Sequence, residues 1–146
     1  MYILIIMAVL AGSVLPIQAG LGIQLGRSVQ QPIFGAFASF LVGAIGSLVV
    51  LILIDFDFKS VQQSFNVPAW PWAAGLLAAF YVISVFLVAP KLGAALTFAL
   101  VVVGQLILST ILDHYGLFGF PAKPVNIARV TGVIFLILGV ILIKRF

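Results

Sequence analysis

Four neutral polar residues lie inside long apolar runs of this 146-residue sequence. Their side chains can donate and accept hydrogen bonds without carrying a charge at neutral pH. An unpaired amide or hydroxyl is costly in hydrocarbon, so such side chains should face a neighbouring helix or a water-filled cavity. They are therefore candidates for binding a small solute, with hydrogen bonding between helices as the alternative: Gln18, Ser39, Tyr81 and Gln105.

Two titratable residues, Asp113 and His114, are adjacent at the end of the fourth apolar run. Neighbouring residues of a helix do not face each other, so we do not expect a catalytic pair. An imidazole can titrate near neutral pH, which makes these residues candidates for moving protons or for gating. Capping of the helix and anchoring at the membrane surface explain them as well.

The rest of the composition offers little to an enzyme. The chain has no cysteine, one histidine and three acidic residues, which excludes thiol nucleophiles, disulfides and a multi-histidine metal site within one chain. The basic residues that give the net charge of +4 are scattered singly and build no stripe for nucleic acid. We therefore predict no catalytic residue, no metal, no cofactor, no nucleic-acid partner and no enzymatic activity.

Hydrophobicity dictates the elements that must position these residues. Hydrophobic residues make up 64% of the chain and charged residues 7%, and the mean hydropathy is +1.38, whereas soluble domains have roughly 25% charged residues. A helix needs about 20 residues to cross the hydrocarbon. The continuous apolar runs lack the alternation of a membrane β-barrel. We predict an all-α integral membrane protein, a single domain over 1–146, with spans at 2–24, 33–54, 69–89, 93–112 and 127–143.

The first span could instead be a cleaved signal peptide. No Lys or Arg precedes its apolar run, and the run is long enough to cross the membrane by itself. We therefore expect it to be retained.

The expected connections alternate in length. Those at 27–32 and 90–92 are short and predict tight helical hairpins, whereas those at 55–68 and 113–126 are long and share the opposite face. Aromatic residues in and beside the long connections predict an interfacial belt, with a gate built from Phe118 and Phe120 as a second possibility. The belt residues are Phe56, Phe58, Phe65, Trp70, Trp72, Tyr115, Phe118 and Phe120.

Small residues recur every four positions in the first two spans. Lipid exerts no hydrophobic force between helices, so helix contacts depend on the close packing of small residues. We also expect a kink at Pro16, which lacks a backbone donor deep inside the first span. The two predicted contact stripes are Ala8, Gly12, Pro16 and Gly20, and Gly35, Ser39, Gly43 and Ser47.

Basic residues are divided almost evenly between the two membrane faces. Five spans place the two termini on opposite faces. The face that holds the carboxyl terminus has four Lys or Arg residues, and the other face has three. The bias toward a cytoplasmic carboxyl terminus is small. Two copies inserted in opposite directions would form an antiparallel ten-helix dimer, an arrangement like the inverted repeats of secondary transporters. The alternative is one orientation with a parallel or different partner.

Several segments, taken in order, resemble the YdcZ-like family of the drug/metabolite transporter (DMT, EamA-like) superfamily. They are 15–27, 39–43, 79–82, 90–95, 104–105 and 113–119. The resemblance implies a bacterial inner-membrane protein of five helices, equivalent to half of a ten-helix transporter. Small multidrug exporters of that superfamily use a glutamate in their first helix where this sequence has Gln18, so the resemblance gives no support for proton-coupled export of organic cations.

These features together favour a secondary transporter for a small metabolite or drug-like solute. It would work by alternating access in an antiparallel homodimer, or in a heterodimer with a similar five-span chain, with the lipid bilayer and the solute as its other partners. The four neutral polar residues would line the cavity. A non-transporting accessory or assembly subunit is the alternative, and the substrate, the direction and the coupling ion stay open.

Overall fold

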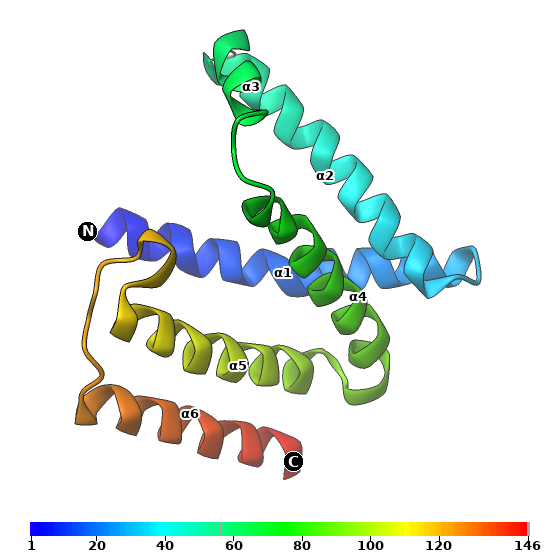
Figure 1. Cartoon of the computed structure of the whole chain (residues 1–146). Helices are drawn as coiled ribbons and strands as arrows, with labels where there is room; N and C mark the ends of the chain where they lie inside the picture. Colours follow the sequence, from blue (N-terminus) through cyan, green and yellow to red (C-terminus); the bar gives the residue numbers. More distant parts are fainter. Residues whose placement is uncertain (56, 146) are drawn as a thin grey trace. The chain divides into compact units, whose positions relative to one another are not determined.

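The computed structural model describes residues 1–55 and 57–145, without the side chains of Asp55 and Phe58. These residues form six α-helices and two short 3₁₀ turns (Figure 1). The elements are α1 (Tyr2–Ser28), α2 (Pro32–Asp55), α3 (Phe58–Ser64), η1 (Trp70–Ala73), α4 (Ala74–Leu92), α5 (Ala94–Tyr115), η2 (Leu117–Gly119) and α6 (Ile127–Arg145).

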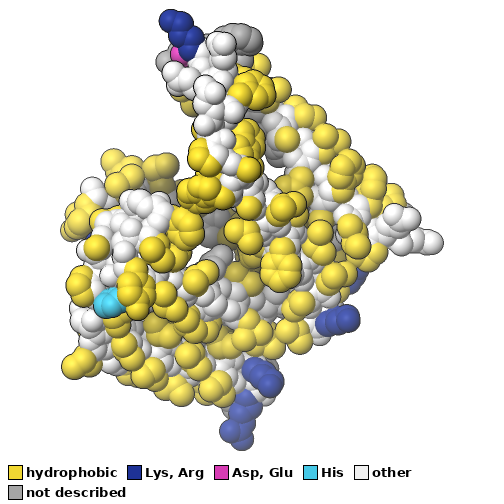
Figure 2. Space-filling view, viewed as in Figure 1, with side chains coloured by type: hydrophobic (Ala, Val, Ile, Leu, Met, Phe, Trp, Pro, Cys, Tyr) yellow, Lys and Arg dark blue, Asp and Glu magenta, His cyan; other side chains and the backbone are white. Residues whose placement is uncertain are grey.

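Five of these helices are long and apolar enough to cross a membrane, so the structure confirms the predicted all-α class and has five candidate spans among the described residues. They are α1, α2, α4 with the preceding η1, α5 and α6. Large apolar side chains such as Leu53 and Phe80 are exposed, at 78% and 73%. Apolar side chains are spread over the face of the molecule that Figure 2 shows. Exposure on this scale is suited to contact with lipid.

The helix ends differ from the prediction at three connections. The connection predicted at 90–92 is helical, because α4 continues through Pro90 to Leu92. It ends at Gly93, whose φ of +83° favours glycine. Helix α5 continues to Tyr115 and ends at Gly116, with φ of +61°, so Asp113 and His114 lie in its last turn.

The third difference is the short helix α3, which lies within the connection predicted at 55–68. The carboxylate of Asp57 accepts a hydrogen bond from the backbone N–H of Lys59 at 2.9 Å and caps this short helix. The predicted belt residues Phe65, Trp70, Trp72, Tyr115, Phe118 and Phe120 are exposed, while Phe56 and the side chain of Phe58 lie outside the described residues.

The chain divides into two compact units, Met1–Pro90 and Lys91–Phe146. In the first unit, α1 and α2 form a helical hairpin that is closed by three residues, 29–31. The N–H of Gln31 donates to the carbonyl of Gly26 at 2.8 Å, and Gln30 adopts a positive φ of 58°. Figure 1 shows the two helices diverging from this turn. They therefore pack tightly only near the turn.

Three glycines form the close contact between α1 and α2. A Cβ on Gly35 would overlap the backbone carbonyl of Gly22, and it would lie 3.1 Å from the backbone nitrogen of Gly26. A Cβ on Gly22 would overlap the ring of Phe86, which brings α4 against the same place. The buried apolar residues of the first unit belong to these three helices: Ala19 of α1, Ala36 of α2, and Val82, Val85 and Phe86 of α4.

This contact face of α1 differs from the predicted stripe. Gly12 and Gly20 have no atom within 4 Å of an added Cβ, and Gly43 on α2 also has open space around it. The face in contact is that of Ala19, Gly22 and Gly26, whose spacing of three and four residues follows one side of a helix. Because the hairpin opens away from its turn, the stripe of α2 is in close contact with α1 at Gly35 and not at Gly43.

In the second unit, α5 and α6 pack side by side and run in opposite directions (Figure 1). The connection between them is fastened to the end of α5, where the N–H of Lys123 donates to the carbonyl of Asp113 at 2.7 Å. The side chain of Asn126 accepts from the N–H of Arg129 at 2.9 Å and caps α6.

Candidate functional site

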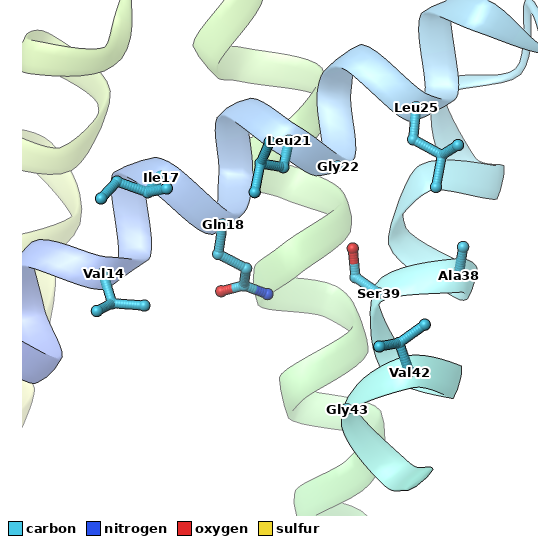
Figure 3. Close-up of a pocket in the computed structure, with 10 residues that line it drawn as sticks. All are labelled: Val14, Ile17, Gln18, Leu21, Gly22, Leu25, Ala38, Ser39, Val42 and Gly43. Carbon is cyan, nitrogen blue, oxygen red and sulfur yellow. The ribbon is translucent and has the colours of Figure 1, made fainter. Parts of the chain in front are cut away.

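A pocket of about 540 Å³ lies between α1 and α2, inside the first unit. Most of its lining is apolar, and Gln18 and Ser39 are the polar side chains in it. Figure 3 shows the amide of Gln18 extending from α1 and the hydroxyl of Ser39 extending from α2 into the space between the helices. The remaining lining residues are Val14, Ile17, Leu21, Gly22, Leu25, Ala38, Val42 and Gly43.

The shape of the hairpin creates this pocket. Gly22 and Gly35 bring the helices together near the turn, and beyond them the helices separate. Gly22 also lines the pocket, and its α-carbon lies against the ring of Phe86 from α4. The glycine contact therefore determines where the pocket begins.

The two polar side chains of the pocket differ in their hydrogen bonding. The hydroxyl of Ser39 donates to the carbonyl of Gly35 at 2.8 Å, so its oxygen can still accept a hydrogen bond from a bound molecule. The amide of Gln18 is exposed and has no hydrogen-bond partner within 1–55 and 57–145. In hydrocarbon this amide needs a partner, either water or a solute.

Two of the four predicted cavity residues therefore meet in one pocket. Tyr81 is in the same unit, half-buried on α4, but it does not line this pocket. Gln105 is exposed on α5 in the second unit. Helix α1 continues without a break through Pro16, half a turn before Gln18.

The apolar residues of the pocket are not among the residues predicted from the sequence. A signal was present, because Val14, Leu21 and Leu25 recur at helical spacing on the side of α1 that carries Gln18. The same holds for Ala38 and Val42 around Ser39 on α2. In a chain with 64% hydrophobic residues, however, helical spacing of apolar residues does not separate a pocket from a lipid-facing surface.

Asp113 and His114 have separate partners, as expected for adjacent residues of a helix. The carboxylate of Asp113 lies 3.4 Å from the guanidinium of Arg129, which also donates to the carbonyl of Lys123 at 3.1 Å. The Nδ1 atom of His114 accepts a hydrogen bond from the N–H of Val125 at 3.1 Å. The sequence places Arg129 only among the basic residues that bear on orientation and does not predict its pairing with Asp113.

The Asp113–Arg129 pair borders a smaller cavity of about 300 Å³ between α5 and α6. Ser109, Thr110 and Gly132 also line it. Over the part of the chain that the structure describes, no three His, Cys, Asp or Glu residues come together as a metal site would require.

Comparison with known families gives a match that covers nearly the whole chain. Residues 3–142 match the DMT_YdcZ family, described as "Putative inner membrane exporter, YdcZ". No curated protein and no solved structure matches the chain. The matched residues include both cavities and all five long helices in whole or in large part. The chain therefore belongs to the YdcZ family of DMT-type transporters and is a multi-pass inner membrane protein.

Proposed function

We propose that this protein is a secondary transporter for a small, largely apolar solute with a neutral hydrogen-bonding group, and that this solute binds between α1 and α2. The observation that carries the proposal is the position of Gln18 and Ser39, which extend from two helices into one pocket with an otherwise apolar lining. The family membership supports transport in general.

The lining favours a particular kind of solute. Burial of apolar surface contributes about 25 cal/mol per Å², so the aliphatic side chains of the pocket supply affinity without selecting a charge. The amide of Gln18 can both donate and accept a hydrogen bond. The hydroxyl of Ser39 already donates to the carbonyl of Gly35, so it can only accept one from the solute. A solute with a hydroxyl, an amide or a ring N–H would satisfy both side chains.

A second chain in the opposite orientation would complete the transporter. The pocket lies between two helices that diverge from their turn, and the window of α2 that would cross the membrane has no buried residue. Ten helices in two inverted halves provide a site near the midplane that can be exposed to either side in turn. The partner would be a second copy, which the near-even distribution of basic residues permits, or a similar five-span chain.

Substitution of Gln18 by Leu tests this function. Cells that overproduce the protein are challenged with a panel of toxic neutral solutes, and a solute against which they gain resistance is then assayed in proteoliposomes. Loss of one or two hydrogen bonds, each contributing about 0.5–1.5 kcal/mol, should lower transport roughly tenfold. Gln24→Leu is the matched control, because Gln24 is exposed on the same helix and does not line the pocket.

Equal loss of transport in both variants would indicate general damage to α1 and not a binding role for Gln18. Full transport by Gln18→Leu would exclude the pocket as the solute site. An accessory role would replace transport on two results together. The wild-type protein confers no resistance and transports no member of the panel, and expression of the Gln18→Leu variant repairs a membrane defect in cells that lack the protein.

A further inference from the structure

We propose a second binding site in this protein, between α5 and α6, for a zwitterion that carries an ammonium group close to an anionic oxygen group. The site is the cavity that Asp113 and Arg129 border together with Ser109, Thr110 and Gly132. It lies entirely within the second unit and does not depend on the solute proposed for the pocket of α1 and α2.

The ion pair in this cavity leaves half of each partner unused. Only Oδ2 of Asp113 meets the guanidinium, and only Nη1 of Arg129 makes the contact, at 3.4 Å. Oδ1 of Asp113 and the Nε and Nη2 groups of Arg129 have no partner among the residues that the structure describes. A carboxylate–guanidinium pair at its best forms two parallel bonds below 3 Å. This pair therefore has an acceptor and donors to offer to a third molecule.

Two hydroxyl groups add acceptors to the carboxylate side of the cavity. The hydroxyls of Ser109 and Thr110 both donate to the carbonyl of Leu106, at 3.1 and 2.7 Å. Their protons are thus committed within α5, and their oxygens can accept from an ammonium group. An ammonium would lie toward Asp113 and these oxygens, and an anionic group toward Arg129.

The exposure of the pair allows a ligand to compete with it. Both side chains are 31% exposed, and an ion pair this accessible contributes little to stability. Gly132 leaves room on the α6 side, because an added Cβ there would have no atom within 4 Å. A ligand can enter without displacing a packed side chain.

The surroundings favour the headgroup of a phospholipid as the source of the zwitterion. Asp113 is in the last turn of α5 and Arg129 in the first turn of α6, so both lie at one end of the helix pair. The connection between these helices carries the exposed aromatic residues Phe118 and Phe120, which are typical of the headgroup level of a membrane. An ethanolamine phospholipid has the required ammonium and phosphate, and a free zwitterion of the same chemistry is the other source.

The test measures binding of short-chain phospholipids to the purified full-length protein in a nonionic detergent. We expect the ethanolamine phospholipid to bind at least about tenfold more tightly than the glycerol phospholipid with the same acyl chains. Soluble phosphoethanolamine is titrated separately. Binding of the lipid alone identifies a headgroup site, and comparable binding of phosphoethanolamine identifies a site for a free zwitterion.

Variants locate the site. Asp113→Asn and Arg129→Gln should each weaken binding of the ethanolamine probe about tenfold. The matched controls Asp57→Asn and Arg27→Gln change an exposed acid and an exposed arginine elsewhere in the chain and should bind as the wild type does. Gly132→Leu fills the cavity and leaves both charged residues in place, so it should also weaken binding. This variant tests the site even if the charge variants do not fold.

Three results would overturn the proposal. The first is equally tight binding of the glycerol phospholipid, because an anion alone would then be sufficient. The second is binding of the ethanolamine probe by folded Asp113→Asn, Arg129→Gln or Gly132→Leu that equals the wild type. The third is no binding of either ethanolamine probe by the wild-type protein.

Discussion

Gly35 lies against Gly22 so closely that a Cβ on Gly35 would overlap the backbone carbonyl of Gly22. This approach joins α1 to α2 beside their turn and determines where the pocket between them starts. A backbone carbonyl cannot move aside as the tip of a side chain can. A larger residue at either glycine should therefore lower the stability of the protein measurably.

Gly35→Ala should destabilise the protein by about 1–3 kcal/mol, because the helices must separate to admit the methyl group. Gly43→Ala is the matched control on the same helix, since its Cβ would have no atom within 4 Å. The apparent melting temperature in detergent, followed by circular dichroism, compares the two. A Gly35→Ala variant as stable as Gly43→Ala would show that the close contact is not maintained in the folded protein.

Ser39→Ala should lower solute affinity with little change in stability. The hydroxyl donates to its own helix, at the carbonyl of Gly35, so its removal leaves no donor unpaired in the folded chain. Loss of one acceptor for the solute corresponds to about 1 kcal/mol, or roughly a fivefold increase in the solute concentration for half-maximal transport. Ser47→Ala is the control, because Ser47 bonds to its own helix in the same way and does not line the pocket. Equal effects of the two substitutions would argue against a contact between Ser39 and the solute.

Insertion in both orientations is a separate prediction, which follows from the three and four basic residues on the two faces. Paired reporters on the carboxyl terminus, one active only in the cytoplasm and one only in the periplasm, should both give a signal. Additional lysines beside Lys144 should shift the signal toward the cytoplasmic reporter. Activity of one reporter alone would contradict the antiparallel homodimer and leave a different chain of opposite orientation as the partner.

Gly116→Ala should destabilise the end of α5. The φ of Gly116 is +61°, and a Cβ there would lie 3.2 Å from the Cβ of Ala122. The substitution therefore adds backbone strain and a crowded contact, which together should cost about 1–2 kcal/mol of stability. Gly104→Ala within the same helix has open space and should be neutral or stabilising by up to about 1 kcal/mol. An apparent melting temperature that falls for Gly116→Ala and stays the same or rises for Gly104→Ala would agree with this reasoning, and an equal fall in both variants would contradict it.

The five spans could be predicted from the sequence because a membrane requires long apolar helices whatever their packing. Gln18 and Ser39 were identifiable for the same reason, since a polar side chain in an apolar run needs a partner. Their convergence on one pocket was not predictable. It depends on how α1 and α2 pack, and the close contact of Gly22 with Gly35 between them cannot be read from either helix alone.

The small-residue stripe of the first span is not the face that contacts α2 within the chain. Gly12 and Gly20 have the spacing of a contact face, but Ala19, Gly22 and Gly26 have it too, and only the packed hairpin distinguishes them. The pairing of Asp113 with Arg129 was hidden for a related reason. Sixteen residues separate the two, and α5 had to continue to Tyr115 before the carboxylate could face α6.

None of the ten residues around the pocket of α1 and α2 carries a charge. The membrane potential acts on a moving charge with about 2.3 kcal/mol per 100 mV, and it does no work on a neutral amide or hydroxyl. A neutral solute carried by this pocket would therefore cross without moving charge. Voltage would contribute only if an ion bound elsewhere in the protein moved with the solute, and without such an ion the solute's own gradient would have to supply the driving force.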